Sequence, residues 1–222
     1  MKLPTILILP TVLLLAILFP PFAQPSPADD DAPAITEVQI DPGQRVGPLK
    51  IGDTQDRALE LFPLKKDVDQ QWGDDCGTTV DWVDSKNPNG RGDLAIRFKK
   101  GKVFQIESST TRFHTAEGIT TFDSPSAVRD HYKDMRAYTL LTAPTSSLGD
   151  RPLIFWVDKK KGIAFALAYY PQEHKRYIYK IIVFVPNKEF CPEEETTHSP
   201  KWQEIRPYSL EPPADLSPER AN

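Results

Sequence analysis

Two stretches of this chain share one pattern of apolar and polar positions. Each stretch has a Trp-Val-Asp triplet, then a turn, then two short runs in which large apolar residues alternate with others. The first copy spans residues 82–106 and the second spans residues 156–181. Alternation with a period of two places successive side chains on opposite faces of a β-strand. The pattern therefore predicts a duplicated set of antiparallel strands.

A short helix is predicted before each set of strands. In the first copy Asp53 or Thr54 can cap a helix, because its side-chain oxygen can accept an otherwise unpaired backbone N–H. In the second copy Ser124 as the cap, with Pro125 in the first helical position, is a strong start signal. A polar connection and then three strands follow each helix. The predicted strands are residues 78–84, 94–98, 103–107, 153–158, 163–170 and 176–185.

These elements predict an α+β fold. We expect two tandem helix–(β)3 repeats, which form a mainly antiparallel sheet with the helices on one face. The large residues of the strand at 163–170 must face the helices, because the helices are the only apolar cover in the pattern. The alternate positions of that strand carry alanine and look outward.

The outward face is the predicted binding surface. Small residues framed by Tyr and Arg suit protein recognition, since Tyr and Arg are over-represented among interface hot spots. The alternative is that the alanines pack against the other repeat or the tail. The candidate binding residues are Arg97, Ala164, Ala166, Ala168, Tyr170 and Tyr177.

Five segments are predicted along the chain. Residues 1–28 read as a signal peptide, because a positive start and an apolar run end at a small-x-small site. The alternative is an uncleaved inner-membrane anchor at 3–23, since about 20 apolar residues can span a bilayer. The other segments are an acidic linker (29–46), repeat 1 (47–116), repeat 2 (117–191) and a disordered Pro/Glu-rich tail (192–222), part of which could dock through Trp202, Ile205 and Tyr208.

The predicted export affects how the two cysteines are interpreted. Cys76 precedes the first strand of copy one, and Cys191 follows the last strand of copy two. An oxidising compartment permits a disulfide between them, and two buried thiols are the alternative. Such a bond closes a loop of roughly 115 residues, which the chain-entropy model values at about 4–5 kcal/mol.

The composition and the motifs argue against several classes of function. A net charge of −4 without a basic stripe argues against nucleic-acid binding. None of the four histidines has metal-ligand spacing, and no nucleophile elbow, phosphate loop or dinucleotide fingerprint is present. We therefore predict no enzyme, no cofactor and no metal. Any membrane contact would run through the N-terminal segment.

The repeated units carry a family resemblance. Ile51-Gly52-Asp53-Thr54 before the first helix is echoed by Asp123-Ser124 before the second, and both Trp-Val-Asp hairpins support the match. This arrangement over residues 47–185 resembles the β-lactamase inhibitor protein architecture and the SmpA/OmlA-type outer-membrane assembly lipoprotein domain. The usual Gly-Met is Gly52-Asp53 here, and the lipid-bearing cysteine is absent. The resemblance implies protein binding through an open sheet face, without a catalytic centre.

The functional expectation is an exported, non-catalytic protein. We expect a protein- or ligand-binding module that uses the sheet face opposite the helices. The alternative is a structural envelope-associated domain tethered by an uncleaved leader.

Overall fold

The structure is a computed structural model. It describes residues 35–63, 71–74, 77–83, 92–140, 153–188, 191 and 202–211. All of them belong to one compact unit that begins at Pro33. The predicted signal peptide and the residues before 35 lie outside the described residues. Neither described helix is long and apolar enough to cross a membrane.

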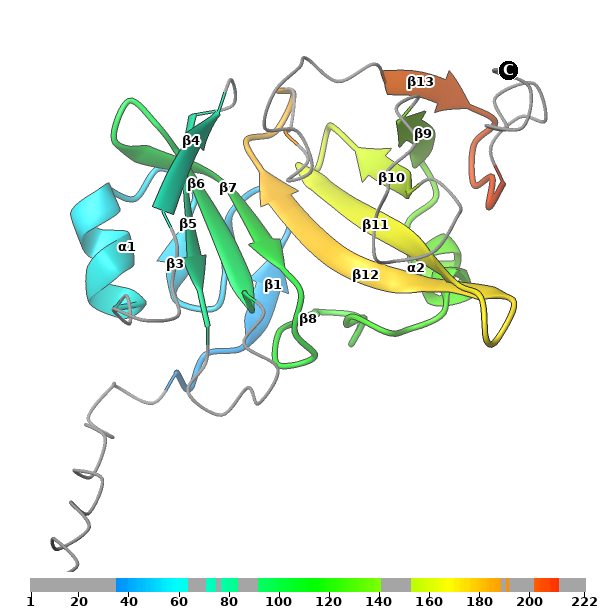
Figure 1. Ribbon diagram of the computed structural model, residues 1–222, viewed down its shortest axis with the longest axis horizontal. Coiled ribbons are helices and arrows are strands. Elements are labelled where there is room, and N and C mark those ends of the chain that lie inside the picture. The colour runs from blue at the N-terminus through cyan, green and yellow to red at the C-terminus, as the bar shows by residue number, and fades with distance from the viewer. Residues whose placement is uncertain are drawn as a thin grey trace, which may run out of the picture. The chain divides into compact units, whose positions relative to one another are not determined.

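The fold is mostly β, and the predicted α+β class is wrong. Among the residues that the structure describes, strands account for 45% and helices for only 11%, because the two helices are short. The dominant element is a nine-stranded antiparallel sheet (Figure 1). From edge to edge its strands are β13 (Trp202–Ile205), β9 (Arg136–Leu140), β10 (Ile154–Asp158), β11 (Ile163–Tyr170), β12 (Lys175–Phe184), β7 (Lys102–Ser108), β6 (Leu94–Lys99), β5 (Gly77–Trp82) and β4 (Gln71–Asp74).

The strand order shows the duplication and corrects the helix–(β)3 unit. The central pair of the sheet is β7 and β12. On one side of it the order continues with β6, β5 and β4, and on the other side with β11, β10 and β9. Each repeat therefore contributes four strands. The additional strands, β4 and β9, occupy stretches whose sequence predicts polar connections. β4 reads Gln-Trp-Gly-Asp, which carries no apolar alternation.

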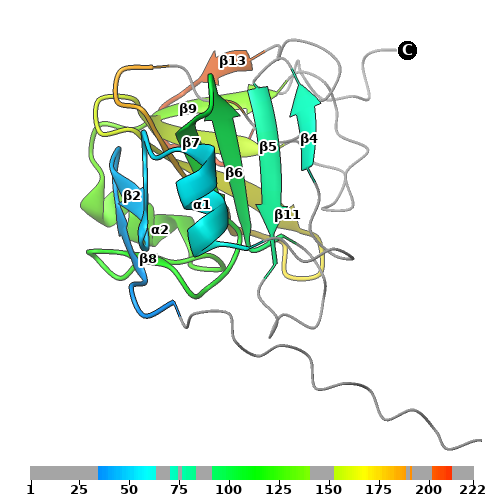
Figure 2. The ribbon, with the colours of Figure 1, turned by 90° about the vertical axis from the view of Figure 1, so that its left-hand side faces the viewer.

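A second sheet supplies much of the cover that the prediction assigned to helices. Its strands are β3 (Leu49–Lys50), β2 (Arg45–Val46), β1 (Gln39–Asp41) and β8 (His114–Thr115). The pairs are antiparallel except β1 with β8, which is parallel. This sheet includes residues that the sequence assigned to an acidic linker. Figure 2 shows β2 and β8 beside α1, in front of the large sheet.

Both helix starts are confirmed. Helix α1 (Gln55–Leu61) begins at Thr54, whose Oγ1 accepts the Arg57 N–H at 3.2 Å. Helix α2 (Pro125–His131) begins at Ser124, and Pro125 occupies its first turn. Seven residues make fewer than two full turns, so each helix depends on packing for its stability.

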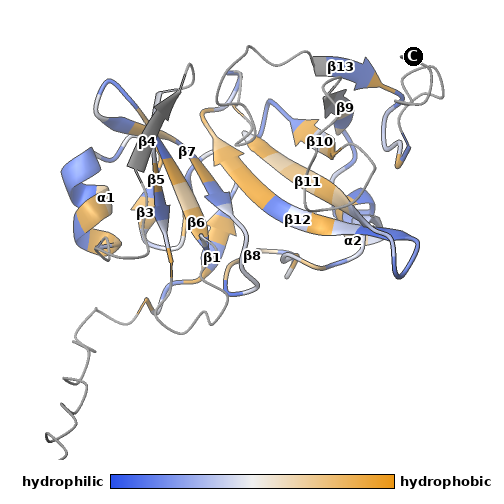
Figure 3. Cartoon of the chain, viewed as in Figure 1, coloured by the Kyte–Doolittle hydropathy of each residue, from blue (hydrophilic) through white to orange (hydrophobic). Residues whose placement is uncertain are grey.

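The sheet is buried on both faces. One face joins α1, α2 and the small sheet in a core that includes Trp82, Ile96, Val128 and Trp156. The other face carries a second apolar cluster along β10, β11 and β12. Apolar residues dominate β11 and the C-terminal end of β12, while the loop between the two strands is hydrophilic (Figure 3).

Part of the predicted disordered tail is ordered. Strand β13 pairs with β9 and places Ile205, only 5% exposed, in the core. The Tyr208 hydroxyl donates to the Tyr132 carbonyl at 2.8 Å and accepts the Met135 N–H at 3.3 Å. The disorder prediction is therefore corrected for residues 202–211, and the docking alternative holds there for Ile205 and Tyr208.

Candidate functional site

The predicted open alanine face is not open. Ala164, Ala166 and Ala168 are at most 1% exposed and pack within the second apolar cluster. Their neighbours there include Phe155 and Ile182. The alanines are buried, so these three residues do not form a contact surface. Their described apolar neighbours all belong to the second repeat, so the alternative of packing against the other repeat or the tail stays untested.

Arg97 is also buried, and it belongs to an ionic network in the sheet. Its Nε donates to Glu107 Oε1 at 2.7 Å, and its Nη1 donates to Thr79 Oγ1 at 3.1 Å. Lys180 Nζ lies 3.3 Å from Glu107 Oε2. Arg97 and Glu107 come from the first repeat and Lys180 comes from the second, so Glu107 joins the two repeats. Arg97 is thus a structural residue and not a binding residue.

The Glu107 carboxyl is ionised by its neighbours. Burial raises its pKa, but the Lys180 ammonium, the Arg97 guanidinium and the amide of Gln105 together hold the pKa below its ordinary value. The side-chain amide of Gln105 also forms two hydrogen bonds with the backbone of Cys191. The Cys191 N–H donates to Gln105 Oε1 at 2.7 Å, and Gln105 Nε2 donates to the Cys191 carbonyl.

Tyr170 and Tyr177 lie together, half exposed, at the end of the β11–β12 hairpin. Their rings meet edge to face with centroids 5.4 Å apart. The Phe122 ring also meets Tyr170 edge to face, with centroids 6.3 Å apart. The Phe122 ring is 54% exposed. We call Phe122, Tyr170 and Tyr177 the aromatic ridge.

Phe122 occupies a position that the first repeat gives to glycine. The Gly52 N–H donates to the Val103 carbonyl at 2.7 Å, and the Phe122 N–H donates to the Ile178 carbonyl at 2.8 Å. Both residues have positive φ, +90° for Gly52 and +68° for Phe122.

The residues that follow extend this equivalence. The carbonyl of Asp53 accepts the Val103 N–H at 2.8 Å, as Asp123 accepts from Ile178 at 3.0 Å. Each aspartate side chain also accepts the N–H three residues earlier. The two turns therefore have the same hydrogen bonds, and Phe122 adopts the left-handed backbone conformation that glycine tolerates best.

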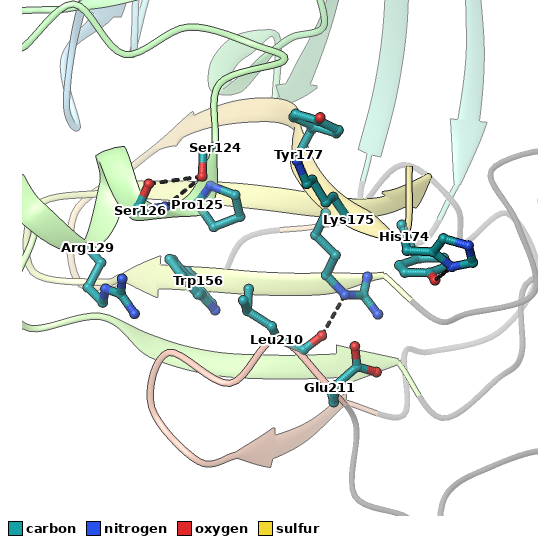
Figure 4. Close-up of a pocket in the computed structure, with 12 residues that line it drawn as sticks. Ser124, Pro125, Ser126, Arg129, Trp156, His174, Lys175, Tyr177, Leu210 and Glu211 are labelled. Atoms are coloured by element: carbon teal, nitrogen blue, oxygen red, sulfur yellow. Dashed lines mark hydrogen bonds between the residues drawn. The ribbon is translucent and has the colours of Figure 1, made fainter. Parts of the chain in front are cut away.

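A cavity of about 460 Å³ opens next to the ridge. Its lining comes from four parts of the chain: α2 and its N-cap, Trp156 of β10, the β11–β12 hairpin and residues 210–211. Figure 4 shows Arg129 at one end and His174 at the other, with Trp156 and Leu210 between them. Tyr177 belongs to both the ridge and the cavity lining.

The cavity floor is held by hydrogen bonds. Arg176, only 6% exposed, donates from Nε to the Leu210 carbonyl at 2.6 Å and from Nη1 to the Leu167 carbonyl at 3.0 Å. Trp156 Nε1 donates to the Ser209 carbonyl at 3.0 Å. These bonds tie residues 209–210 to the large sheet and fix the cavity's shape.

The charged groups of the lining are the cations Arg129, Lys175 and Arg176 and one carboxylate, Glu211. Arg129 and Lys175 are exposed, and neither forms an ion pair with a described residue. His174 Nδ1 lies 3.2 Å from the Tyr169 hydroxyl. Within the described part of the chain, no three His, Cys, Asp or Glu side chains gather in a way that could hold a metal ion.

The sequence-based candidates include Tyr170 and Tyr177 of this region, and whether they bind a partner stays a prediction. The candidates did not include Phe122, Arg129 or the cavity. A usable signal for Phe122 was present, because the repeat aligns Phe122-Asp123 with Gly52-Asp53. Cys76, the partner in the predicted disulfide, lies outside the described residues.

Comparison with known proteins gives little functional information. No family model and no curated protein matches the chain. A similar solved structure is the uncharacterized protein yfeY from Escherichia coli. It shares 14% sequence identity, covers 67% of this chain and 99% of its own, and has a TM-score of 0.40.

Proposed function

We propose that this chain is an exported, non-catalytic module that binds another protein through the aromatic ridge. The observation that carries the proposal is Phe122, a large apolar residue exposed to solvent at the repeat's glycine position. This reassigns the binding surface from the buried alanine face to the end of the β11–β12 hairpin, and keeps Tyr170 and Tyr177 of the predicted residues.

The fold gains little from this phenylalanine. A left-handed conformation is unfavourable by roughly 1–2 kcal/mol for a residue with a side chain. Glycine serves the same turn in the first repeat, where a Cβ at Gly52 would meet no atom within 4 Å. Backbone strain held in place by surrounding hydrogen bonds is characteristic of functional sites.

The ridge has the physical properties of an interface hot spot. Its rings are held against one another by edge-to-face contacts, so docking orders few side chains. The Tyr177 hydroxyl donates to the Glu173 carboxylate, which raises the pKa of Tyr177. The phenol therefore stays neutral and oriented, as suits a contact surface.

Export rests on the leader at residues 1–28, and the tethered envelope domain is the second candidate. N-terminal sequencing of the mature protein separates them. A mature chain that starts at Asp29 and is recovered without membrane supports the exported module. A chain retained in membranes with residues 3–23 intact supports the tethered domain.

The direct test is site-specific photo-crosslinking in cells. A benzoylphenylalanine at position 122 or 170 should give discrete adducts with another protein. Lys100 is the matched control, because it is also exposed and has a positive φ of 53°, but lies in the β6–β7 turn. Absence of adducts at 122 and 170, or equal adducts at 100, would overturn the proposal.

A further inference from the structure

The cavity beside the ridge has two cations that the protein itself does not neutralise. Some exposed arginines of the described chain are paired, such as Arg57 with Glu60 at 2.6 Å and Arg136 with Glu204 at 3.4 Å. Arg129 and Lys175 have no such carboxylate partner among the described residues. Their charges remain available at the rim of a hollow with a fixed floor.

The size and walls of the cavity fit a peptide segment. A volume of about 460 Å³ lies within the range of ligand-binding sites. Leu210, 39% exposed, and Pro125 give the cavity an apolar wall, and Ser124 and Ser126 add hydroxyl groups. A cavity with an apolar wall and cations at its rim suits a peptide whose charged groups are carboxylates.

The protein as a whole carries a net negative charge, so the cationic rim attracts acidic groups only locally. At −4 the protein repels acidic molecules in general, so attraction at the rim is local. The aromatic ridge continues from the cavity through Tyr177, which places an apolar contact and an anion contact side by side.

We propose that the cavity binds an acidic peptide segment of the protein that docks on the ridge. Arg129 and Lys175 attract its carboxylates, and Tyr177 joins the two contact areas. This inference rests on the proposed function and specifies the chemistry of the partner.

The test uses the full mature chain and fluorescein-labelled hexapeptides of Glu, Gln or Lys, measured by fluorescence anisotropy. The Glu peptide should bind more tightly than the Gln peptide, and the Lys peptide should not bind. Arg129→Gln and Lys175→Gln should each weaken Glu-peptide binding by about two- to fivefold, the range of single exposed ion pairs. Added salt should weaken it further.

Lys100→Gln is the matched control, since it removes an exposed lysine far along the sheet from the cavity. Equal binding of the Glu and Gln peptides, or an equal loss in Lys100→Gln, overturns the assignment. Binding of phosphatidylglycerol vesicles without binding of the Glu peptide also overturns it, in favour of a membrane surface. If the Glu peptide fails while crosslinks at position 122 persist, only this inference falls and the docking function stands.

Discussion

Glu107 lies directly opposite Ile182 where the two repeats meet. On either side of this pair, Ile106 faces Val183 and Ser108 faces Ile181, so the junction is symmetric in register. The side chains are not symmetric, because one repeat contributes a carboxylate and the other an isoleucine. Arg97 and Lys180 approach the carboxylate from both repeats, so the single Glu107 neutralises charges from each side.

Removing that carboxylate should destabilise the whole domain. Glu107→Gln keeps the shape of the side chain but leaves two buried cations without their shared anion. We expect the free energy of unfolding to fall by about 3–5 kcal/mol, as for other broken buried ion pairs. Urea denaturation followed by tryptophan fluorescence measures it. Glu60→Gln, which breaks an exposed pair, is the control and should change little.

The same carboxylate should make stability depend on pH. The pKa of Glu107 is lower in the folded protein than its ordinary value of 4.5. The unfolded chain therefore binds this proton more readily, and the stabilisation is fully present above pH 4.5. It is lost as the pH falls through the folded-state pKa. Urea midpoints between pH 7 and pH 3 should fall less in Glu107→Gln than in the wild type, and parallel curves would contradict this assignment.

The repeat and six strands of the large sheet could be predicted from sequence because their signals are local. Alternation at 163–170 defines β11 with the bounds that the structure has. The two caps, Thr54 and Ser124, likewise act within one turn of helix. The class was wrong because β4 and the strands of the small sheet carry weak patterns. β4 reads Gln-Trp-Gly-Asp, the strands of the small sheet are two or three residues long, and β1 also depends on β8, more than 70 residues away.

The candidate site was only partly predictable for a related reason. Period-two alternation tells which face Ala166 occupies but not whether another segment covers that face. Arg97 looked like a contact residue because the alternation does not show that its guanidinium pairs with the buried Glu107 carboxylate on the neighbouring strand. The cavity depends on the Arg176–Leu210 hydrogen bond, which joins a strand to a segment predicted to be disordered.

Two glycine substitutions should separate backbone strain from steric overlap. A Cβ at Gly52 meets no atom within 4 Å, so Gly52→Ala carries only the conformational penalty at φ +90°. We expect a loss of about 1–2 kcal/mol. A Cβ at Gly162 would lie 2.3 Å from the Phe184 carbonyl oxygen, so Gly162→Ala adds a backbone shift to the same penalty. Urea unfolding should show the larger loss at 162, and equal losses would contradict the geometry.

The predicted Cys76–Cys191 disulfide can be tested chemically, by labelling its thiols. Cys191 is held in place by Gln105, whose Oε1 accepts the Cys191 N–H at 2.7 Å. In the oxidised protein we expect maleimide to label neither thiol until a reductant is added.

Substitution of the cysteines gives the energetic check. Cys76→Ser and Cys191→Ser should each lower stability by about 4–5 kcal/mol, as expected for a loop of this length. The double variant should lose no more than either single variant, because one bond is removed in all three. Additive losses would indicate two independent buried thiols.

Phe122→Asn should separate docking from folding. Asparagine tolerates the left-handed conformation and so relieves roughly 1–2 kcal/mol of strain, while the lost contact with Tyr170 costs about 0.5–1.5 kcal/mol. The two effects oppose each other, and we expect the free energy of unfolding to change by less than about 1 kcal/mol. Crosslinking from position 170 should nevertheless disappear in this variant. Lost crosslinks together with a large loss of stability would instead make Phe122 a structural residue, and retained crosslinks would show that its ring takes no part in docking.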